Sequence, residues 1–591
     1  MKHNYNLILV TFLWLSFPVA LQAQEWQWGK RGGSTDEIPA SSLDNEEHVQ
    51  AMTTDENGNV YLLSPIGIAN ADVDGHQKNT YSEYGGGGGA NIDYVIASFD
   101  CSGNYRWSKV IGGSGSDVLL GLETDGLGHI YTTGRVIRNS PGFPVHFGSE
   151  GVANDTILPY GSGNQNKASL FVVQYTTEGV MNWLRMPQAA DVSEIDATNG
   201  QTSVHLSVDA SGNVFWICYI QPGTYVQGAF VNTTPGRSLY MFKYDVNGNF
   251  SGAVPIDMQL GGSAVNHLKM VRNPANGNLY VAGYKSLLSD DTVIMGGQNV
   301  SNHLYIAAFN ASGNYLWKKE NTLTASYSLD MDITLDTSGT VYITGATVSG
   351  DGFNGQVFTS ANNQPFPFVL SMNSNGNTLW QTNASTNNSV FGDGITVHGN
   401  EVFITGGNAG NLNWSGSQLT VPTNSGYKVF TARFNRQTGG LNALAMLNGS
   451  FGFSDFGTAT TADTAGNYYV GGKFGSQLQI AGQTVLNTGQ QTDFFIAKYG
   501  TATCEVLSVG STALKTLKVY PNPTNGALTI VQDIPQVLHY KLYTVLGTIV
   551  AKGEVNEIQS QVDLSAAVTG IYTLQLTDNK GAEQWIKVVK R

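Results

Sequence analysis

The sequence predicts an all-β chain, because two short phrases alternate along most of its length. The first phrase is a turn rich in Asp, Asn and Gly followed by an apolar strand that ends in Gly, as at residues 125–134. The second is an aromatic strand that runs into another Gly turn, as at residues 94–104. Apolar segments of period two between Gly, Asn and Asp turns are typical of antiparallel hairpins.

Each phrase occurs seven times, and the two alternate strictly. The turn phrase recurs at residues 55–64, 125–134, 209–218, 276–283, 336–345, 399–406 and 463–472. The aromatic strand recurs at residues 94–100, 170–175, 239–245, 304–310, 368–373, 429–435 and 494–499. Two hairpins per unit make four strands, so the chain is predicted to form a seven-bladed β-propeller.

The last unit lacks its fourth strand, and the start of the mature chain matches the missing piece. In five of the first six units a Trp or Phe follows the second turn, at Trp107, Trp183, Phe250, Trp317 and Trp380. Leu441 stands near this place in the sixth unit, and the seventh aromatic strand stops at Tyr499, whereas residues 25–30 read EWQWGK. The first strand is therefore predicted to complete the last sheet and close the ring, which leaves no open edge. A linear β-solenoid is the alternative, and it gives no reason for this match.

The units are longer than many propeller repeats, and the excess lies between their second and third strands. These inserts span residues 64–92, 135–168, 219–237, 284–302, 346–364, 408–426 and 473–492. Because the connections after every second strand leave from the same end of a propeller, we expect the inserts to form one functional face.

The repeated phrases Asp-x-x-Gly-Asn-x-Tyr-x-x-Gly and Phe-x-x-x-Phe-Asp-x-x-Gly-x-x-x-Trp resemble the bacterial secreted β-propeller repeat family. The resemblance covers about residues 24–500 and implies a propeller fold. The family has no shared catalytic residue that could be assigned to this chain.

Composition limits the partners of the chain. Lys and Arg number 30 against 44 Asp and Glu, so the formal net charge is −14, although charged residues make up only 13% of the 591 positions. Nucleic acid and anionic membranes both require a basic patch, which this balance argues against. Three cysteines, Cys101, Cys218 and Cys504, allow at most one disulfide bond, and we expect three unpaired thiols.

The N-terminus predicts a cleaved secretion signal at residues 1–23. Lys2 and His3 precede an apolar run at residues 7–20, and Ala23 provides the small residue at the cleavage position. The run is too short to span a bilayer comfortably, and no later stretch is apolar enough for a membrane helix. The predicted domains are therefore the signal peptide (1–23), the propeller (24–500), a linker rich in Thr, Ser and Ala (501–516) and a small C-terminal β domain (517–591).

The C-terminal domain carries five short phrases in a fixed order over about 75 residues. Their main residues are Tyr520, Pro521, Asn522, Pro523, Asn525, Gly526, Gly570 and Tyr572. The prolines fix an extended start and the Asn-Gly pair a tight turn. These phrases closely resemble the type A C-terminal sorting domain of type IX secretion. The resemblance implies interaction with the type IX secretion machinery and passage through the periplasm to the surface of a Gram-negative bacterium. It also implies removal of this domain, with surface attachment or release.

Aromatic residues fall into two groups. Those at repeat positions are expected to pack between blades. Those outside the repeat frame are the better candidates for stacking on a ligand, namely Tyr81, Tyr84, Tyr160, Tyr225 and Trp414. Histidines are scattered singly, and one such as His129 at a hairpin turn is expected to be solvated.

Acidic residues recur where the first strand of a unit begins, next to the mouth of the predicted central channel. They are Glu47, Asp117, Asp330, Asp393 and Asp455. Several carboxylates that converge on one mouth could hold a hard cation such as Ca²⁺ through oxygen ligands. The alternative is that each Asp initiates a turn and hydrogen-bonds its own backbone.

The usual hydrolase motifs H-E-x-x-H and G-x-S-x-G are absent from the sequence. The leading hypothesis is a non-enzymatic binding or adhesion protein that recognises an extracellular glycan or protein. A polysaccharide lyase or glycosidase that uses the channel-mouth carboxylates is the competing hypothesis. A structural component of the surface layer or matrix is the third.

Overall fold

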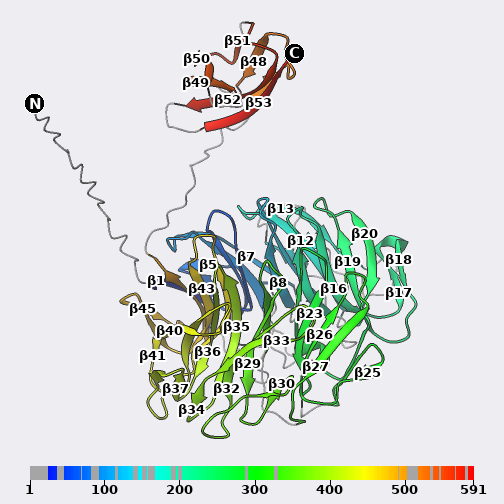
Figure 1. Cartoon of the computed structure of the whole chain (residues 1–591), viewed down its shortest axis with the longest axis vertical. Coiled ribbons are helices and arrows are strands. Elements are labelled where there is room, and N and C mark those ends of the chain that lie inside the picture. Colours follow the sequence, from blue (N-terminus) through cyan, green and yellow to red (C-terminus); the bar gives the residue numbers. More distant parts are fainter. Residues whose placement is uncertain are drawn as a thin grey trace, which may run out of the picture. The chain divides into compact units, whose positions relative to one another are not determined.

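The computed structural model describes residues 24–501 and 517–591 apart from short gaps. The gaps are 36–45, 68, 82–91, 114–116, 138–143, 149–155, 158–166, 188–194, 197–201, 287–289, 325–330, 490–491, 533–536, 545–547, 566 and 579–582. The predicted signal peptide and most of the predicted linker lie outside the described residues. The chain separates into two compact units, Met1–Cys504 and Glu505–Arg591 (Figure 1).

Within the described residues, the first unit contains seven antiparallel sheets of four main strands each. Sheet 1 has β2 (Ala51–Thr54), β3 (Val60–Ile66), β6 (Asp93–Phe99) and β7 (Tyr105–Gly112), and sheet 2 has β8 (Val118–Thr124), β9 (His129–Ile137), β12 (Lys167–Thr176) and β13 (Met181–Arg185). Sheet 3 has β15 (Thr202–Val208), β16 (Val214–Ile220), β19 (Ser238–Tyr244) and β20 (Phe250–Pro255), and sheet 4 has β22 (Leu268–Arg272), β23 (Leu279–Tyr284), β26 (Leu304–Phe309) and β27 (Tyr315–Glu320). Sheet 5 has β28 (Asp332–Leu335), β29 (Val341–Thr347), β32 (Phe366–Met372) and β33 (Thr378–Asn383). Sheet 6 has β35 (Val390–His398), β36 (Glu401–Asn408), β39 (Lys428–Asn435) and β40 (Leu441–Met446), and sheet 7 has β42 (Phe456–Ala462), β43 (Tyr468–Phe474), β46 (Asp493–Gly500) and β1 (Glu25–Gly33).

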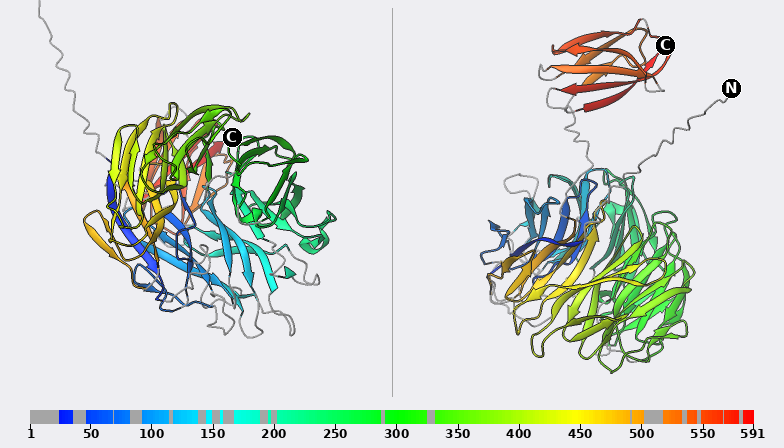
Figure 2. Two further views of the ribbon diagram at one scale, coloured as in Figure 1. Left: turned by 90° about the horizontal axis from the view of Figure 1, so that it is seen from below. Right: turned by 60° about the vertical axis from the view of Figure 1, so that its left-hand side comes forward.

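The N-terminal strand completes the seventh sheet, as predicted. β1 pairs antiparallel with β46, so that Trp26 lies opposite Tyr499 and Gly32 opposite Phe494. The innermost strands of the seven sheets contact one another in a closed circle that runs β2, β8, β15, β22, β28, β35, β42 and back to β2. Figure 2 shows the sheets following one another around this circle. The contact between the first and last sheets contradicts the linear alternative.

One contact recurs between neighbouring sheets and explains the regular spacing of tryptophan. The indole N–H of Trp183, on the outermost strand of sheet 2, donates to the carbonyl oxygen of Val246 in the β19–β20 turn of sheet 3 (3.0 Å). The ring also covers Gly248 of that turn, where an added Cβ would lie 2.8 Å from the ring. Only glycine allows a ring to approach the backbone this closely. Both contacts recur for Trp28 with Cys101 and Gly103, Trp107 with Thr177 and Gly179, Trp317 with Ser374 and Gly376, and Trp380 with Arg436 and Gly439.

The Asp residues of the turn phrase hold the turn before the second strand of each hairpin. Oδ1 of Asp463 accepts the backbone N–H groups of Ala465 (3.0 Å) and Asn467 (2.9 Å). Its Oδ2 accepts the side-chain amide of Asn467 (2.8 Å) and the hydroxyl of Tyr469 (3.0 Å). The two backbone bonds recur at Asp55, Asp125, Asp209 and Asp336. This is the local role that Asp commonly has in turns.

The described parts of the inserts fold into short hairpins rather than open loops. They are β4–β5 (Asp72–Val73, His76–Gln77), β10–β11 (Val145–Phe147, Thr156–Ile157), β17–β18 (Gly223–Tyr225, Phe230–Asn232), β24–β25 (Thr292–Met295, Gln298–Asn299), β30–β31 (Gly352–Phe353, Gln356–Val357), β37–β38 (Asn411–Trp414, Ser417–Thr420) and β44–β45 (Gln477–Ile480, Gln483–Leu486). β4 and β10 pair with β1 and β7, the last strands of the preceding sheets. β24, β37 and β44 pair with β21 (Met258–Gly261), β34 (Ser385–Thr386) and β41 (Asn448–Gly449). These three short strands come directly after β20, β33 and β40, the last strands of sheets 3, 5 and 6. Each of these five hairpins therefore ties its own sheet to the one before it.

Tight turns set the direction of these hairpins. In β44–β45 the two turn residues, Ala481 and Gly482, have φ of +51° and +75°. In β37–β38 Ser415 and Gly416 have φ of +51° and +88°. Positive φ at both central residues is the type I′ geometry, whose twist matches that of the flanking strands.

Smaller elements complete the first unit. β14 (Ile195–Asp196) pairs with the beginning of β12, and two 3₁₀ turns, η3 (Val226–Gly228) and η4 (Ala264–Asn266), lie beside the third and fourth sheets. Among the described residues of the chain, no helix is long and apolar enough to cross a membrane.

The second unit consists of two sheets that share one core. One sheet has β47 (Lys518–Tyr520), β48 (Ala527–Val531) and β51 (Gln559–Asp563). The other has β50 (Ile549–Val555), β49 (Leu538–Thr544), β52 (Gly570–Asp578) and β53 (Glu583–Lys590). Leu528 and Val562 of the first sheet lie in the same apolar cluster as Leu542 and Leu574 of the second.

The phrases that mark this unit in the sequence meet in its structure. The N–H of Val589 near the C-terminus donates to the side-chain oxygen of Asn522 (2.9 Å). The N–H of Leu564, just after β51, donates to the carbonyl oxygen of Gly526 in the N-terminal turn (2.6 Å). The hydroxyl of Tyr572 donates to the carbonyl oxygen of Val568 (2.6 Å). The phrases are thus parts of one fold rather than independent signals.

The cysteines differ from the expectation of three unpaired thiols. Cys101, in the turn between β6 and β7, is disulfide-bonded. Cys218 on β16 is free and buried, and burial raises the pKa of its thiol well above the ordinary value. A buried thiol of raised pKa is unreactive, because the thiolate is the nucleophile. Three cysteines allow at most one disulfide bond, and the chain forms one.

Candidate ligand-binding groove

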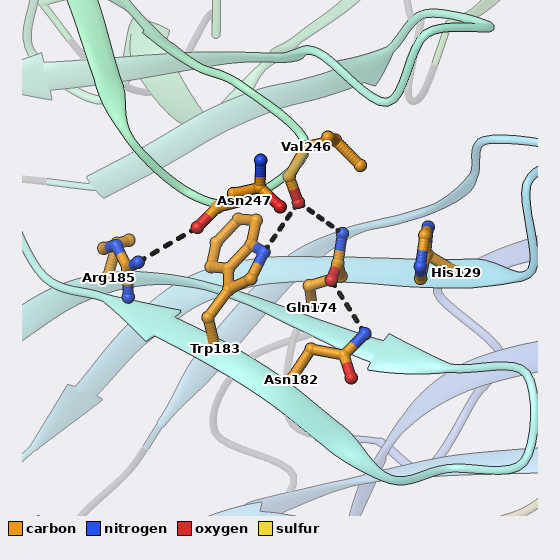
Figure 3. Close-up of a pocket in the computed structure, with 7 residues that line it drawn as sticks. All are labelled: His129, Gln174, Asn182, Trp183, Arg185, Val246 and Asn247. Carbon is orange, nitrogen blue, oxygen red and sulfur yellow. Dashed lines mark hydrogen bonds between the residues drawn. The ribbon is translucent and has the colours of Figure 1, made fainter.

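A groove of about 490 Å³ opens where sheets 2 and 3 meet, at the end of the sheets that carries the Asp turns and not at the insert end, which was expected to be the functional face. Its walls come from the start of β9, the end of β12, the start of β13 and the β19–β20 turn. They are lined by His129, Gln174, Asn182, Trp183, Arg185, Val246 and Asn247 (Figure 3). Small-molecule sites in proteins have volumes of roughly 300–1,000 Å³, so the groove is large enough for such a ligand.

Hydrogen bonds between the lining residues fix the back of the groove. The carbonyl oxygen of Val246 accepts both the indole N–H of Trp183 and the side-chain amide of Gln174, each at 3.0 Å (Figure 3). The side-chain oxygen of Gln174 accepts the amide of Asn182 (2.8 Å). The guanidinium of Arg185 donates to the carbonyl oxygens of three residues and lies 5.3 Å from the centre of the Trp183 ring. These side chains are therefore held in place before any ligand arrives.

His129 belongs to a pair that the sequence interpretation missed. Its Nδ1 lies 2.7 Å from Oδ2 of Asp125, whose side chain is fully buried and also accepts the hydroxyl of Tyr131 (2.9 Å). The imidazole is 26% exposed, so Nε2 is its remaining polar atom at the groove. Asn occupies the same turn position at Asn59 and Asn213. The signal that could have found the pair was a histidine where the repeat otherwise places asparagine.

Several polar atoms of the lining are available to a ligand. Within the part of the chain that the structure describes, no contact uses Nε2 of His129, Oδ1 of Asn182 or the side-chain amide of Asn247. Asn182 and Asn247 are both exposed. Amide and imidazole groups combine donors with acceptors, which is what a hydroxyl group requires of its partners.

The corresponding place at other junctions is filled differently. The residue that precedes the junction tryptophan is Arg106 between sheets 1 and 2, where it forms an ion pair with Glu178 (2.8 Å). It is an exposed leucine at Leu316 and at Leu379. At the junction of sheets 2 and 3 the same position holds Asn182, which is short and uncharged.

Tyr225 and Trp414, two of the residues predicted to stack on a ligand, are buried in this structure. Trp414 on β37 is 0% exposed and Tyr225 on β17 is 4% exposed. Trp414 packs against Phe434 of sheet 6, with ring centres 4.8 Å apart. Both residues lie in insert hairpins that fold back onto a sheet, so their rings turn toward the core. Neither ring keeps a face for a ligand.

Of the other predicted stacking residues, the structure describes Tyr81 alone. Tyr81 is half-buried, and its ring is stacked on that of His146 with centres 3.7 Å apart. One face of this ring is thus covered by the insert of the next sheet. Tyr84 and Tyr160 lie outside the described residues.

The predicted cation ligands do not gather in the described residues, where no group of three or more His, Cys, Asp or Glu side chains is placed to hold a metal ion. Asp455 lies 3.1 Å from the ammonium of Lys428, and burial raises the pKa of this carboxyl to about 6. Glu47 accepts the backbone N–H of Gly67 (2.7 Å), and burial raises its pKa to about 8. Asp455 and Glu47 thus bond to neighbouring protein groups. This agrees with the alternative that such acids form local hydrogen bonds and do not bind a cation.

The other three predicted cation ligands are Asp117, Asp393 and Asp330. Asp117 accepts the backbone N–H of Gly113 (2.9 Å) and is buried. Asp393 is half-buried on β35, where the pairing with β36 is irregular. Asp330 lies outside the described residues. The described acids among the five do not come together in one cluster. A calcium site at the channel mouth therefore stays a prediction.

Different titratable groups surround the centre of the ring. The charge of Lys269 on β22 acts on His48 before β2, on His205 of β15 and on Asp332 of β28. Burial is the main cause in each case and lowers the pKa of both histidines, that of His205 to about 4, while it raises the pKa of Asp332. A lysine that influences sheets 1, 3 and 5 from sheet 4 must lie near the ring centre. Glu47 instead accepts the backbone N–H groups of Ser34 and Gly67.

Comparison with known proteins identifies the second unit. Residues 518–591 match the family model of the secretion system C-terminal sorting domain. The chain therefore carries a type IX sorting domain. This domain indicates export to the cell surface or secretion and implies interaction with the type IX secretion machinery. No curated protein matches the chain.

Solved structures offer only distant likenesses to the chain. The quinohemoprotein alcohol dehydrogenase of Comamonas testosteroni is 10% identical, with 85% of this chain and 79% of that one covered and a TM-score of 0.35. The endosialidase of phage phi92 is 11% identical, with coverages of 96% and 86% and a TM-score of 0.34. PorZ, a surface component of the type IX secretion system of Porphyromonas gingivalis, is 11% identical, with coverages of 92% and 99% and a TM-score of 0.18. TM-scores this low assign neither a fold nor an activity to this chain.

Proposed function

We propose that the chain is an exported seven-bladed β-propeller that binds a glycan or protein ligand at the cell surface or after release, without catalysing a reaction. Seven four-stranded sheets whose innermost strands form a closed circle support the propeller. The sorting domain supports display outside the cell. The observation that carries the binding role is the groove between sheets 2 and 3, with unused polar atoms on three of its side chains.

The lining of the groove favours a neutral glycan over other ligands. His129, Asn182 and Asn247 offer uncharged donors and acceptors, which suit sugar hydroxyls. The guanidinium of Arg185 already donates to three carbonyl oxygens, and the Asp125 carboxylate is buried beneath the imidazole. A phosphorylated or sulfated ligand would need cations that are free to form charge-assisted bonds.

Binding is tested with the mature chain, residues 24–591, on a panel of neutral glycans, acidic glycans and matrix proteins, followed by calorimetry on each ligand found. His129→Asn installs the residue that other turns of the repeat have at this position, so the fold is retained. Asn182→Ala and Asn247→Ala remove the unused amides. We expect each variant to weaken binding about two- to tenfold, because one well-placed hydrogen bond contributes roughly 0.5–1.5 kcal/mol.

Asn375→Ala is the matched control. Asn375 occupies in the β32–β33 turn of sheet 5 the position that Asn247 occupies in sheet 3, and its backbone bond to the turn is the same. Its loss should leave the affinity unchanged. Binding that survives all three groove variants would contradict the groove as the site. Shortened products from a polysaccharide would favour the lyase or glycosidase alternative, and a chain that binds nothing on the panel would favour a structural component of the surface or matrix.

A further inference from the structure

We propose that the centre of the ring is a second binding site, besides the groove, and that it takes a sugar with one carboxylate, as in a uronic acid residue of a glycan. This site goes beyond the proposed function, because the groove lies between sheets 2 and 3 and suits an uncharged ligand. The residues that form the site lie on the innermost strands, which contact one another in a closed circle.

The innermost strands have an apolar face and a polar face. On five of them the apolar face lies in a core shared with the preceding sheet, through Leu122, Leu206, Met270, Ile333 and Ile395. Side chains alternate along a strand, so the residues next to these five point away from that core. Lys269, next to Met270, is exposed although β22 is an innermost strand. Solvent therefore reaches the polar face at the ring centre.

The strand register places seven residues of the polar face at one level of the ring. Each pairs with the residue before the end of the repeated turn phrase, as Lys269 pairs with Ala282 before Gly283. Three consecutive sheets contribute ionisable side chains at this level, His205, Lys269 and Asp332. The other four sheets contribute at most a methyl group, from Ala51, Gly121, Gly394 and Ala459. The ionisable side chains therefore face no large side chain from the other sheets at this level.

Lys269 provides the positive charge of the site. Its ammonium forms no hydrogen bond and no ion pair within the part of the chain that the structure describes. Its charge acts on His205 and Asp332 to either side and on His48 of sheet 1. The carboxyl of Asp332 accepts the backbone N–H of Ile395 on sheet 6 instead (2.9 Å). A free ammonium in a partly enclosed place attracts an anion more strongly than one on the open surface, because the charge is less screened.

The groups around Lys269 select a ligand with a single negative charge. His205 stays uncharged, since burial lowers its pKa to about 4, and its buried Nε2 has no partner among the described residues. The other cation of β22, Arg272, packs over the ring of Phe215 on sheet 3 (3.4 Å). One free ammonium matches one carboxylate, whereas a phosphate dianion would need further free cations for its charge-assisted bonds.

Hydroxyl groups lie two residues further along the same polar face. Among the described residues no contact uses the hydroxyl oxygens of four half-buried side chains at this level, Ser207, Thr334, Thr396 and Thr461. Hydroxyls both donate and accept hydrogen bonds, as sugar hydroxyls do. Glu123 stands at the same level, and burial raises its pKa to about 7. The ring centre thus combines one free positive charge with a polar lining, which suits a uronic acid.

The test is calorimetric titration of the mature chain, residues 24–591, with glucuronate and with glucuronamide, its uncharged counterpart. We expect glucuronamide to bind about tenfold or more weakly than glucuronate, because hydrogen bonds between charged groups are stronger than those of an amide. Lys269→Met should weaken the binding of glucuronate to the level of glucuronamide. Lys319→Met is the matched control, since Lys319 lies on β27, the outermost strand of the same sheet, and its loss removes the same charge.

Asp332→Asn should produce a change of opposite sign. It removes an acid that acts on the charge of Lys269 and keeps an oxygen for the N–H of Ile395, so glucuronate should bind more tightly. A variant that only loosened the fold would not do this, and weaker binding of glucuronate to Asp332→Asn would overturn the inference.

Four other results would also overturn it. They are no binding of glucuronate to the native chain, equal affinities for glucuronate and glucuronamide, unchanged glucuronate binding in Lys269→Met, and tighter binding of inorganic phosphate than of glucuronate. Loss of glucuronate binding in His129→Asn would place the acidic sugar in the groove and would overturn the site at the ring centre as well. If Lys269→Met does not fold, Asp332→Asn and the two sugars on the native chain still decide the question.

Discussion

Gly439→Ala tests directly what holds neighbouring sheets together. Gly439 has φ of +70°, and an added Cβ would lie 2.5 Å from the ring of Trp380. Gly416 has φ of +88° but nothing within 4 Å of an added Cβ. Alanine in the left-handed region costs about 1–2 kcal/mol at either position. At Gly439 the ring must also move, and overpacking of this kind costs a further ~1–3 kcal/mol. We expect Gly439→Ala to lower the free energy of unfolding by about 2–5 kcal/mol and Gly416→Ala by about 1–2 kcal/mol.

The assay is urea unfolding of the mature chain, monitored by tryptophan fluorescence. The variants are compared only if the dependence of the unfolding free energy on urea concentration is the same, since a change in it would indicate a changed transition. The same alanine at Gly439 is then measured in a Trp380→Ala background, where the ring is absent. There it should cost only the backbone part, so the two changes couple. Equal losses for the two glycine variants, or no coupling to Trp380, would refute the idea that ring and glycine together hold the junction.

The remaining predictions concern a turn, a buried acid and the closing strand. Ala481→Asn should raise the urea midpoint, because Asn accepts the positive φ of +51° more readily than Ala, for a gain of about 0.5–1 kcal/mol; a lower midpoint would contradict the turn assignment. Burial holds the folded-state pKa of Glu47 at about 8 against an ordinary value of 4.5, so the unfolded chain loses this proton first and stability falls as pH rises between those values. Glu47→Gln should flatten that fall in urea titrations across the range, and an unchanged slope would exclude Glu47 as its source. Deletion of residues 24–33 should leave β46 paired with β43 alone, seen as faster hydrogen exchange at every second backbone amide between Phe494 and Tyr499, those that bond to β1; unchanged protection would contradict closure by this strand.

The repeat made much of the first unit predictable. Alternating residues and recurrent turns locate the main strands, and the displaced tryptophans at residues 25–30 predict that β1 pairs with β46. Such features are local in sequence or are copied seven times, so each copy supports the others. The repeated turn phrase likewise located the turns whose Asp residues accept hydrogen bonds from their own backbone, such as Asp463.

The inserts and the candidate site were harder to predict, for physical reasons. A hairpin has two faces, and sequence alternation does not say which of them meets the protein, so Trp414 was predicted to stack on a ligand although it is buried. Glu47 was likewise expected to bind a cation, yet it accepts the backbone N–H groups of Ser34 and Gly67. The groove lies between residues of sheets 2 and 3 that are distant in sequence, and no local pattern marks it.

The position of β46 decides how the first unit resists tension. β46 lies between β43 and β1, and the chain continues from its end at Gly500 toward the sorting domain. A pull on that downstream segment acts along the strand axis, while the hydrogen bonds run across it to both neighbours. The load is therefore shared by two whole ladders in shear and is not taken by one bond at a time. A chain tethered through its C-terminal side in flowing liquid would meet drag with the strongest geometry that a sheet provides.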